Sequence, residues 1–305
     1  MNNIPTYIKN YESLIFRFCL FDDCCKDFFP KYQSYLISND KILRKRNTSL
    51  TMAEVMTLVV EFHYSKYRDF KAFYHEYVLS FLKPLFPSLC SYNRFVRLAK
   101  RAIMPLFYCL NNLMTKCSGI SFVDSTPLRV CRTKRTFNHK VFKNIASLGK
   151  STMGWFFGFK LHLVVDDQGN LLSFTLTPGN TNDRAPLGKL SKNLFGKLFA
   201  DKGYISSKWF MKLLSKGLKL ITGIKTNMKN KLMTLIDKIY LRKRSLIETI
   251  NDHLKNVCQI EHSRHRSPIN FLVNLFSALI AYQLNPKKPK LNLTNSELKL
   301  LPSHL

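Results

Sequence analysis

The chain has 305 residues, of which 48 are Lys or Arg and 19 are Asp or Glu, giving a formal net charge of +29. This length allows one large or two ordinary domains with a full core, and a basic excess of this size, spread along the chain, indicates a phosphate-bearing partner. The eight cysteines form no Cys-x-x-Cys pair and no zinc-ribbon spacing, which excludes common zinc modules and favours reduced thiols in a cytosolic protein.

An alternative explanation of the charge is a gene of biased base composition that inflates Lys, Asn, Phe and Ile. Arg-rich stretches at 44–46 and 242–244 argue against base composition as the whole explanation.

The first hundred or so residues are predicted to be helical. Thr51 and Glu54 have the spacing of a capping box, and aromatic residues recur at helical spacing over 70–81. Ser91 can cap a following helix whose basic face is either solvated or placed against DNA, and the sequence leaves both open. The residues of that face are Arg94, Arg97 and Arg101.

From Gly119 onward the sequence predicts alternating strands and helices. A short strand over 120–123 ends at Asp124, and a hairpin follows over 157–165 and 171–176. Asp183 is predicted to cap a helix that bears three leucines, and a strand over 198–200 ends at Asp201. The remaining predicted elements are a helix at 209–218, a strand at 220–224, and helices at 241–257 and 270–282.

The apolar stretch 271–284 lies within the last of these helices. It is too short to span a bilayer, so we expect a buried core helix. The start of the sequence has no charged segment followed by an apolar run, so no signal peptide is evident. We therefore expect a cytoplasmic, nucleoid-associated protein with no membrane partner.

Three carboxylates stand isolated in this basic background, namely Asp124, Asp201 and Glu248. No acid occurs between Asp124 and Asp166, or between Asp201 and Asp237. A phosphate-binding surface should exclude acids except where a divalent cation separates carboxylate from phosphate. If the strands that end at Asp124 and Asp201 are neighbours, the two side chains meet, and the late helix can add Glu248. Such a site suits two Mg²⁺ ions, with Mn²⁺ as a substitute, in phosphodiester cleavage.

On the late helix, Arg244, Glu248, Asn251 and Lys255 share one face. An acid flanked by basic groups fits a metal ligand between two phosphate contacts, whereas an ordinary i, i+4 ion pair between Arg244 and Glu248 explains the same spacing. Asp252 lies one position off this face and is the second choice for the third ligand.

Other polar residues have simpler explanations. Asp166 and Asp167 fit a hairpin turn, and His162 is either a packed strand residue or a DNA contact. The run 261–266 has two histidines but no cysteine, so we expect a basic DNA-contacting loop and no zinc site.

Five short motifs together resemble the DDE transposases of bacterial insertion sequences, and most closely insertion-sequence family nine-eight-two. They are Phe-Val-Asp-Ser-Thr at 122–126, Gly-Phe-Lys-Leu-His-Leu at 158–163, Thr-Pro-Gly-Asn at 177–180, Asp-Lys-Gly-Tyr at 201–204, and Arg244, Glu248 and Lys255 with their spacing. Related transposases often have Tyr three residues before the Arg, where this chain has Leu241.

The resemblance implies an α/β fold with an RNase H-like mixed-sheet catalytic domain over 118–285. A helical N-terminal DNA-binding region over 1–117 would precede it, and a basic tail over 286–305 would follow. Asp124, Asp201 and Glu248 would form the Mg²⁺-binding triad. The partners implied are the element's terminal inverted repeats, the target DNA and further copies of the chain.

The expected reaction is strand cleavage followed by strand transfer. The alternatives are an RNase H-like nuclease without strand transfer, and a domesticated DNA-binding protein without catalysis. The residues expected to contact DNA are Arg129, Arg132, Lys134, Arg135, Lys160, Lys202, Arg244, Lys255, Arg264 and Arg266.

Overall fold

The fold is known from a computed structural model that describes residues 6–39, 48–65, 67–226, 228, 232–261 and 265–298. The chain divides into two compact units, each built from two segments. Unit 1 comprises residues 1–113 and 256–284, and unit 2 comprises residues 114–255 and 285–305. Of the predicted catalytic domain at 118–285, residues 256–284 belong to unit 1, where they pack with the N-terminal helices, and the predicted tail at 286–305 belongs to unit 2.

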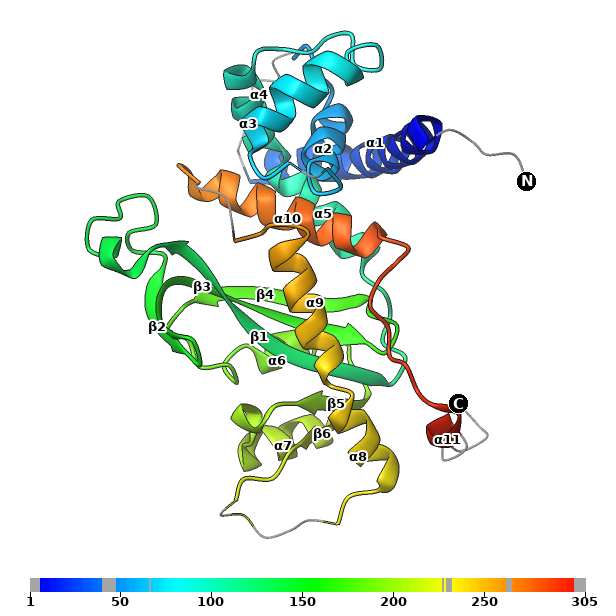
Figure 1. Ribbon diagram of the computed structural model, residues 1–305, viewed down its shortest axis with the longest axis vertical. Coiled ribbons are helices and arrows are strands. Elements are labelled where there is room, and N and C mark those ends of the chain that lie inside the picture. Colours follow the sequence, from blue (N-terminus) through cyan, green and yellow to red (C-terminus); the bar gives the residue numbers. More distant parts are fainter. Residues whose placement is uncertain are drawn as a thin grey trace. The chain divides into compact units, whose positions relative to one another are not determined.

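Unit 1 is a bundle of helices (Figure 1). Its α10 contacts both α2 and α5, and α1 contacts α2 and α5. Because α10 is apolar on nearly all sides, it is buried among its neighbours as the predicted core helix. The helices are α1 (Thr6–Ser38), α2 (Met52–Glu61), α3 (Phe70–Ala72), η1 (Phe73–Leu82), α4 (Tyr92–Ala99), η2 (Lys100–Ala102), α5 (Ile103–Leu113) and α10 (Pro268–Leu284).

Some of the helix signals in the sequence of unit 1 are confirmed and others are not. The Thr51–Glu54 capping box is present at the start of α2. Ser91 occupies the N-cap position of α4, but its side chain makes no capping hydrogen bond. The predicted aromatic stripe is split between α3 and the π-helix η1, whose wider turn leaves Phe81 60% exposed while Phe73 and Tyr74 are buried.

A buried histidine ties the two segments of unit 1 together. His63 Nδ1 lies 2.8 Å from the backbone oxygen of Cys258, and its Nε2 lies 2.9 Å from Ser277 Oγ on α10. Burial lowers the pKa of His63 to about 4, so the ring is neutral at physiological pH.

Unit 2 is built on a six-stranded mixed sheet in the order β2-β3-β1-β5-β6, with β4 also paired to β3 (Figure 1). β1 pairs antiparallel with β3 and parallel with β5. β5 pairs parallel with β6, whereas β4 and β2 are antiparallel to β3. The strands are β1 (Ile120–Cys131), β2 (Ser147–Ser151), β3 (Gly154–Asp166), β4 (Leu171–Pro178), β5 (Gly196–Ala200) and β6 (Leu218–Thr222).

This mixed order, three antiparallel strands and then two strands parallel to β1, is that of an RNase H-like sheet and confirms the predicted fold class. Helices cover both faces, as expected for an α/β layer structure. They are η3 (Thr133–Arg135), α6 (Leu187–Leu190), η4 (Lys202–Tyr204), α7 (Ser207–Leu214), α8 (Leu235–Arg242), α9 (Ser245–Asn256) and α11 (Asn295–Leu298).

Successive side chains of β1 point to opposite faces of the sheet, so alternate residues contact different layers of helices. Val123 belongs to an apolar cluster with Leu187 of α6 and Leu213 of α7. Phe122 faces the opposite side, where its ring stacks on Phe199 of β5, and Phe199 in turn contacts Tyr240 of α8. Asp124, two residues after Phe122, therefore faces the side that bears α8 and α9.

The predicted elements of unit 2 are present with shifted ends. The hairpin of β3 and β4 is confirmed, and Asp166 accepts hydrogen bonds from the backbone amides of Gln168 and Asn170 in its turn. The predicted helix over 241–257 is two helices, α8 and α9, and β2 was not predicted. No helix in the described part of the chain has the length and apolar character that crossing a membrane requires.

Candidate active site

Two acids meet where β1 and β5 stop pairing. The last parallel pair is Val123 with Ala200, and Asp124 and Asp201 come directly after these residues. The condition that the sequence analysis required for the two acids to meet, that their strands are neighbours, is thus fulfilled. The prediction that the strand ends at Asp124 is wrong, because β1 continues to Cys131 through its antiparallel pairing with β3.

The helix α9 brings a third group to Asp124. Asn251 Nδ2 donates a 3.1 Å hydrogen bond to Asp124 Oδ2, so this side of α9 faces β1. Glu248 lies three residues before Asn251 and hence on nearly the same face, whereas Asp252 is exposed. Asn251 Oδ1 is buried and has no hydrogen-bond partner among the described residues.

The carboxyl group of Asp124 is strongly perturbed. Its pKa is raised to about 6, chiefly by burial and to a smaller extent by the negative charges of Glu248 and Asp201, against lowering by the Ser125 backbone and by Arg244. Charges shift the pKa of a group appreciably only when they lie near it, so we treat Asp124, Asp201 and Glu248 as one electrostatic cluster. We call it the acid cluster.

Glu248, a member of the acid cluster, is paired with a basic side chain. Arg244 Nη2 lies 2.6 Å from Glu248 Oε1, and the Glu248 side chain is 55% exposed. The i, i+4 ion pair that the spacing suggested is therefore present. With the side chains so placed, no group of three or more His, Cys, Asp or Glu in the described residues is arranged to hold a metal ion.

The donor chemistry of the acid cluster nevertheless suits Mg²⁺. Its donors are carboxylate oxygens, the ligand type that this hard cation prefers. Burial is the main cause of the raised pKa of Asp124, and the charges of Glu248 and Asp201 add to it, so a divalent cation bound there would favour the ionised carboxylate. In the observed arrangement Glu248 is paired with Arg244.

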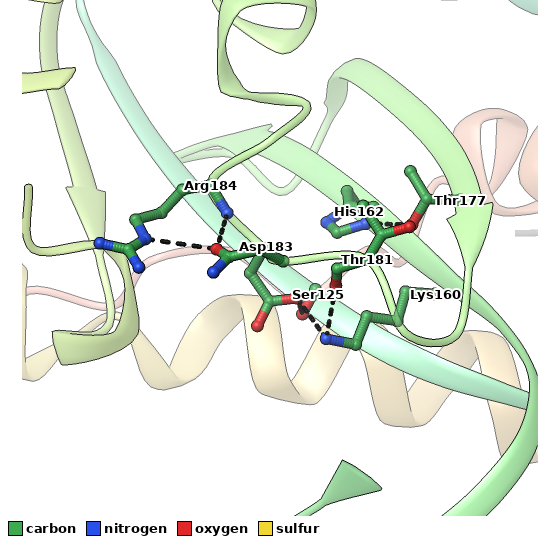
Figure 2. A network of polar contacts seen from close by, with 8 residues as sticks. Ser125, Lys160, His162, Thr177, Thr181, Asp183 and Arg184 are labelled. Carbon is green, nitrogen blue, oxygen red and sulfur yellow. Dashed lines mark hydrogen bonds and ion pairs between the residues drawn. The ribbon is translucent and has the colours of Figure 1, made fainter. Parts of the chain in front are cut away.

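A polar network lies on the other face of β1, next to Asp124 in the sequence (Figure 2). Asp183 Oδ1 accepts hydrogen bonds from Ser125 Oγ at 2.8 Å and from Lys160 Nζ at 2.9 Å. Lys160 Nζ also donates to the backbone oxygen of Thr181 at 3.0 Å. This face of β1 is therefore fixed by a charged pair whose Lys160 side chain is 14% exposed.

Two predictions need correction at this network. Asp183 does not cap the helix α6, whose N-cap is Pro186, because its carboxylate is engaged by Ser125 and Lys160 instead. Lys160, predicted to contact DNA, is directed into the protein by the same ion pair. No local sequence pattern indicates this contact, since Ser125 and Asp183 are 58 residues apart.

Tyr204 and His162 flank this network. Tyr204 is buried beside the acid cluster, and burial, followed by the charges of Asp124 and Asp183, raises the pKa of its hydroxyl group. That hydroxyl has no hydrogen-bond partner among the described residues. His162 is fully buried, with Nε2 2.8 Å from Thr177 Oγ1, which favours the packed strand residue over the DNA contact.

The remaining predicted DNA contacts are mostly at the surface. Lys255 is half-buried on α9, and Arg266 is exposed in unit 1. Arg264 lies outside the described residues, as do residues 44–46. Exposed side chains in unit 2 are Arg129, Arg132, Lys134, Arg135 and Lys202.

A family model described as "Transposase DDE domain" matches residues 114–268, about half of the chain. The comparison with curated proteins found no match. Among solved structures, the chain is similar to a piggyBac transposase synaptic complex with hairpin DNA, at 13% identity and a TM-score of 0.44. That likeness covers 96% of this chain and 86% of the other.

A second similar structure is the Mos1 strand transfer complex, at 12% identity and a TM-score of 0.23. Here 93% of this chain and 89% of the other are covered. The family match spans both segments that supply the acid cluster, β1 with Asp124 at one end and α9 with Glu248 at the other.

Proposed function

This chain belongs to the transposase DDE domain family, and we propose that Asp124, Asp201 and Glu248 are its metal-binding triad. The chain is thus a DNA transposase, an enzyme that acts on phosphodiester bonds. The observation that supports the triad is the acid cluster itself, in which both other carboxylates act on the buried carboxyl of Asp124. Asn251 further supports Glu248 over Asp252, because it orients the Glu248 side of α9 toward β1.

In this proposal the three carboxylates hold two Mg²⁺ ions, or Mn²⁺ in their place. Bound there, the ions supply activation of the attacking oxygen and stabilisation of the leaving oxygen. Asn251 holds Asp124 in position through its 3.1 Å hydrogen bond. Arg244, when Glu248 turns to a metal ion, is released to contact a phosphate of the bound DNA.

The same site serves strand cleavage and strand transfer, since both are phosphodiester displacements. The substrates are the inverted repeats at the element's ends and a target DNA, bound by self-associated copies of the chain in the cytoplasm. The resemblance of the motifs supports membership in insertion-sequence family nine-eight-two.

DNA binding would involve basic side chains of both units. In unit 1, Arg94, Arg97 and Arg101 are exposed on and just after α4, while Phe95, Leu98 and Ala99 are buried. This supports a role of the N-terminal region in holding DNA. In unit 2, the proposed phosphate contacts are Arg129, Arg132, Lys134, Arg135, Lys202 and Lys255.

The test uses a DNA fragment that carries both ends of the genomic segment around the gene, with Mg²⁺ and a supercoiled target plasmid. Asp201→Ala should abolish cleavage and joining while DNA binding is kept or becomes tighter, because a metal ligand and a negative charge are both removed. The control is Asp167→Ala, which removes an acid from the hairpin turn of the same unit.

Cleavage by Asp201→Ala at near the wild-type rate would overturn the triad. Cleavage without joining by the wild-type protein would show a nuclease instead of a transposase. Binding should also weaken steeply as salt rises, because phosphate contacts release counterions.

A further inference from the structure

Large apolar side chains are exposed in the segment that joins β1 to β3. Phe137 is 96% exposed, Met153 is 82% exposed and Trp155 is 55% exposed. Exposed aromatic and apolar groups gathered in one short segment mark an interaction surface more often than chance placement does. The proposed function, which uses the basic residues here, leaves these side chains without a role.

Side-chain contacts and hydrogen bonds hold the backbone of this segment in place. Lys150 on β2 pairs with Trp155 on β3, and Lys150 Nζ lies 5.8 Å from the centre of the Trp155 ring. Thr133 Oγ1 donates a 3.3 Å hydrogen bond to the backbone oxygen of Trp155. The turn after η3 is fastened by His139, whose ring stacks on that of the buried Phe142 at 5.6 Å. The aromatic side chains therefore project from a supported framework.

The charge around them has a single sign. No Asp or Glu occurs between Asp124 and Asp166. The same part of the sequence carries exposed basic residues, of which Lys150 contacts Trp155, namely Arg132, Lys134, Arg135, Lys140, Lys143 and Lys150. A polyanion with apolar faces complements such a surface, and a nucleic acid with unpaired bases has both properties. Paired bases in a duplex do not offer their faces to a side chain.

We propose that Phe137 and Trp155 stack on unpaired bases of the DNA bound at the acid cluster, while the surrounding cations contact its phosphates. This inference rests on the proposed function. The eight residues from Leu163, which pairs with Asp124, to Trp155 span roughly 26 Å of extended strand.

The chain offers a direct readout because it has two tryptophans, Trp155 and Trp209. Trp209 is partly buried against the core of unit 2, so Trp209→Phe leaves Trp155 as the one indole. A mixed-sequence 30-nucleotide single strand should quench the fluorescence of this variant, whereas the matching 30-base-pair duplex should quench it little.

Affinity provides the second measurement. Trp155→Ala combined with Phe137→Ala should weaken binding of the single strand by about tenfold to a hundredfold, since each stacked base contributes measurably. Binding of the duplex should change by less than about twofold. Trp155→Phe should retain most of the single-strand affinity. The control is Phe195→Ala, which removes a 55% exposed aromatic side chain elsewhere in unit 2.

Equal weakening for single strand and duplex, or no weakening for either, would overturn the stacking. Loss of binding to phosphatidylserine vesicles with unchanged DNA binding would assign the surface to an anionic membrane instead. Circular dichroism checks that the variants are folded. The stacking is measured by binding and quenching and the triad by cleavage, so failure of the triad and failure of the stacking are separable.

Discussion

Each of the two units contains an Arg–Glu ion pair, and the two pairs differ in burial and in the sequence separation of the partners. In unit 1, Arg17 of α1 pairs with Glu61 at the end of α2, and both side chains are about nine-tenths buried. The Arg17 guanidinium also lies 4.3 Å from the centre of the Tyr64 ring. In unit 2, Arg244 pairs with Glu248 one helical turn away, and Glu248 is 55% exposed.

The difference shows how one chemical pair can serve two purposes. A buried pair loses its compensation when either partner leaves, which costs several kcal/mol, so it fixes the packing of two helices. An exposed i, i+4 pair is worth only a few tenths of a kcal/mol. Glu248 can therefore leave Arg244 for a metal ion at little cost, which is what a ligand of an assembling site requires.

The largest effect should come from breaking the buried pair. Arg17→Ala leaves Glu61 uncompensated in the core, and we expect the free energy of unfolding to fall by about 3–5 kcal/mol. Urea denaturation of the full chain, followed by circular dichroism of its helices, measures the change. Lys26→Ala is the matched control, because it breaks an exposed i, i+4 pair with Asp22 on the same helix. Similar small changes for both variants would contradict the contrast.

The acid cluster should show itself through pH, with a smaller effect. The pKa of Asp124 is raised to about 6, so the folded protein holds its proton between about pH 4 and 6 where the unfolded chain has released it. Without Mg²⁺, this group therefore lowers the free energy of unfolding as pH rises through that range, by at most about 3 kcal/mol.

Asp124→Asn removes this titration and provides the test. The stability of the variant relative to wild type should increase from pH 4 to pH 7, measured in EDTA. Taking the difference between the two proteins cancels the contribution of the other titrating groups. Mg²⁺ at pH 7 should stabilise wild type more than the variant. A stability difference that does not vary with pH would show that the pKa of Asp124 is not raised in the folded protein.

The sequence predicted those parts of the site that depend on local rules. The positions of Asp124 and Asp201 directly after apolar strands were predictable, whereas the parallel contact of β1 with β5 entered only as a condition. The face shared by Glu248 and Asn251 followed from helical periodicity. Burial of α10 followed from its apolar surface, although that surface could not identify the N-terminal helices as its partners.

Contacts between distant segments could not be predicted in this way. The role of Asp183 depends on Ser125 and Lys160, which belong to other strands, and its own neighbourhood of Asn and Pro resembles a helix cap. The exposed Phe81 illustrates a different limit, because a π-helix changes the periodicity on which the aromatic stripe was based. Register and helix type are decided by tertiary packing.

Substitution of Glu248 should cause the smallest change in stability and a large loss of activity. Glu248→Gln keeps the shape and helix propensity of the side chain but removes a ligand charge, so only the weak pair with Arg244 is lost. The free energy of unfolding should change by a few tenths of a kcal/mol. Mg²⁺-dependent cleavage should fall by at least about a hundredfold, because even residues that merely support metal ligands often contribute tenfold to a hundredfold.

Asp252→Asn is the matched variant on the same helix, since it removes an exposed carboxylate four residues further on. We expect it to retain cleavage, because Asp252 lies about 100° around α9 from Asn251, which contacts Asp124, whereas Glu248 lies only about 60° from Asn251. Cleavage and thermal unfolding, measured on both variants under the same conditions, decide between the two acids. An inactive Asp252→Asn beside an active Glu248→Gln would mean that α9 is rotated in the working enzyme, and Arg244 would then lose its proposed phosphate contact as well.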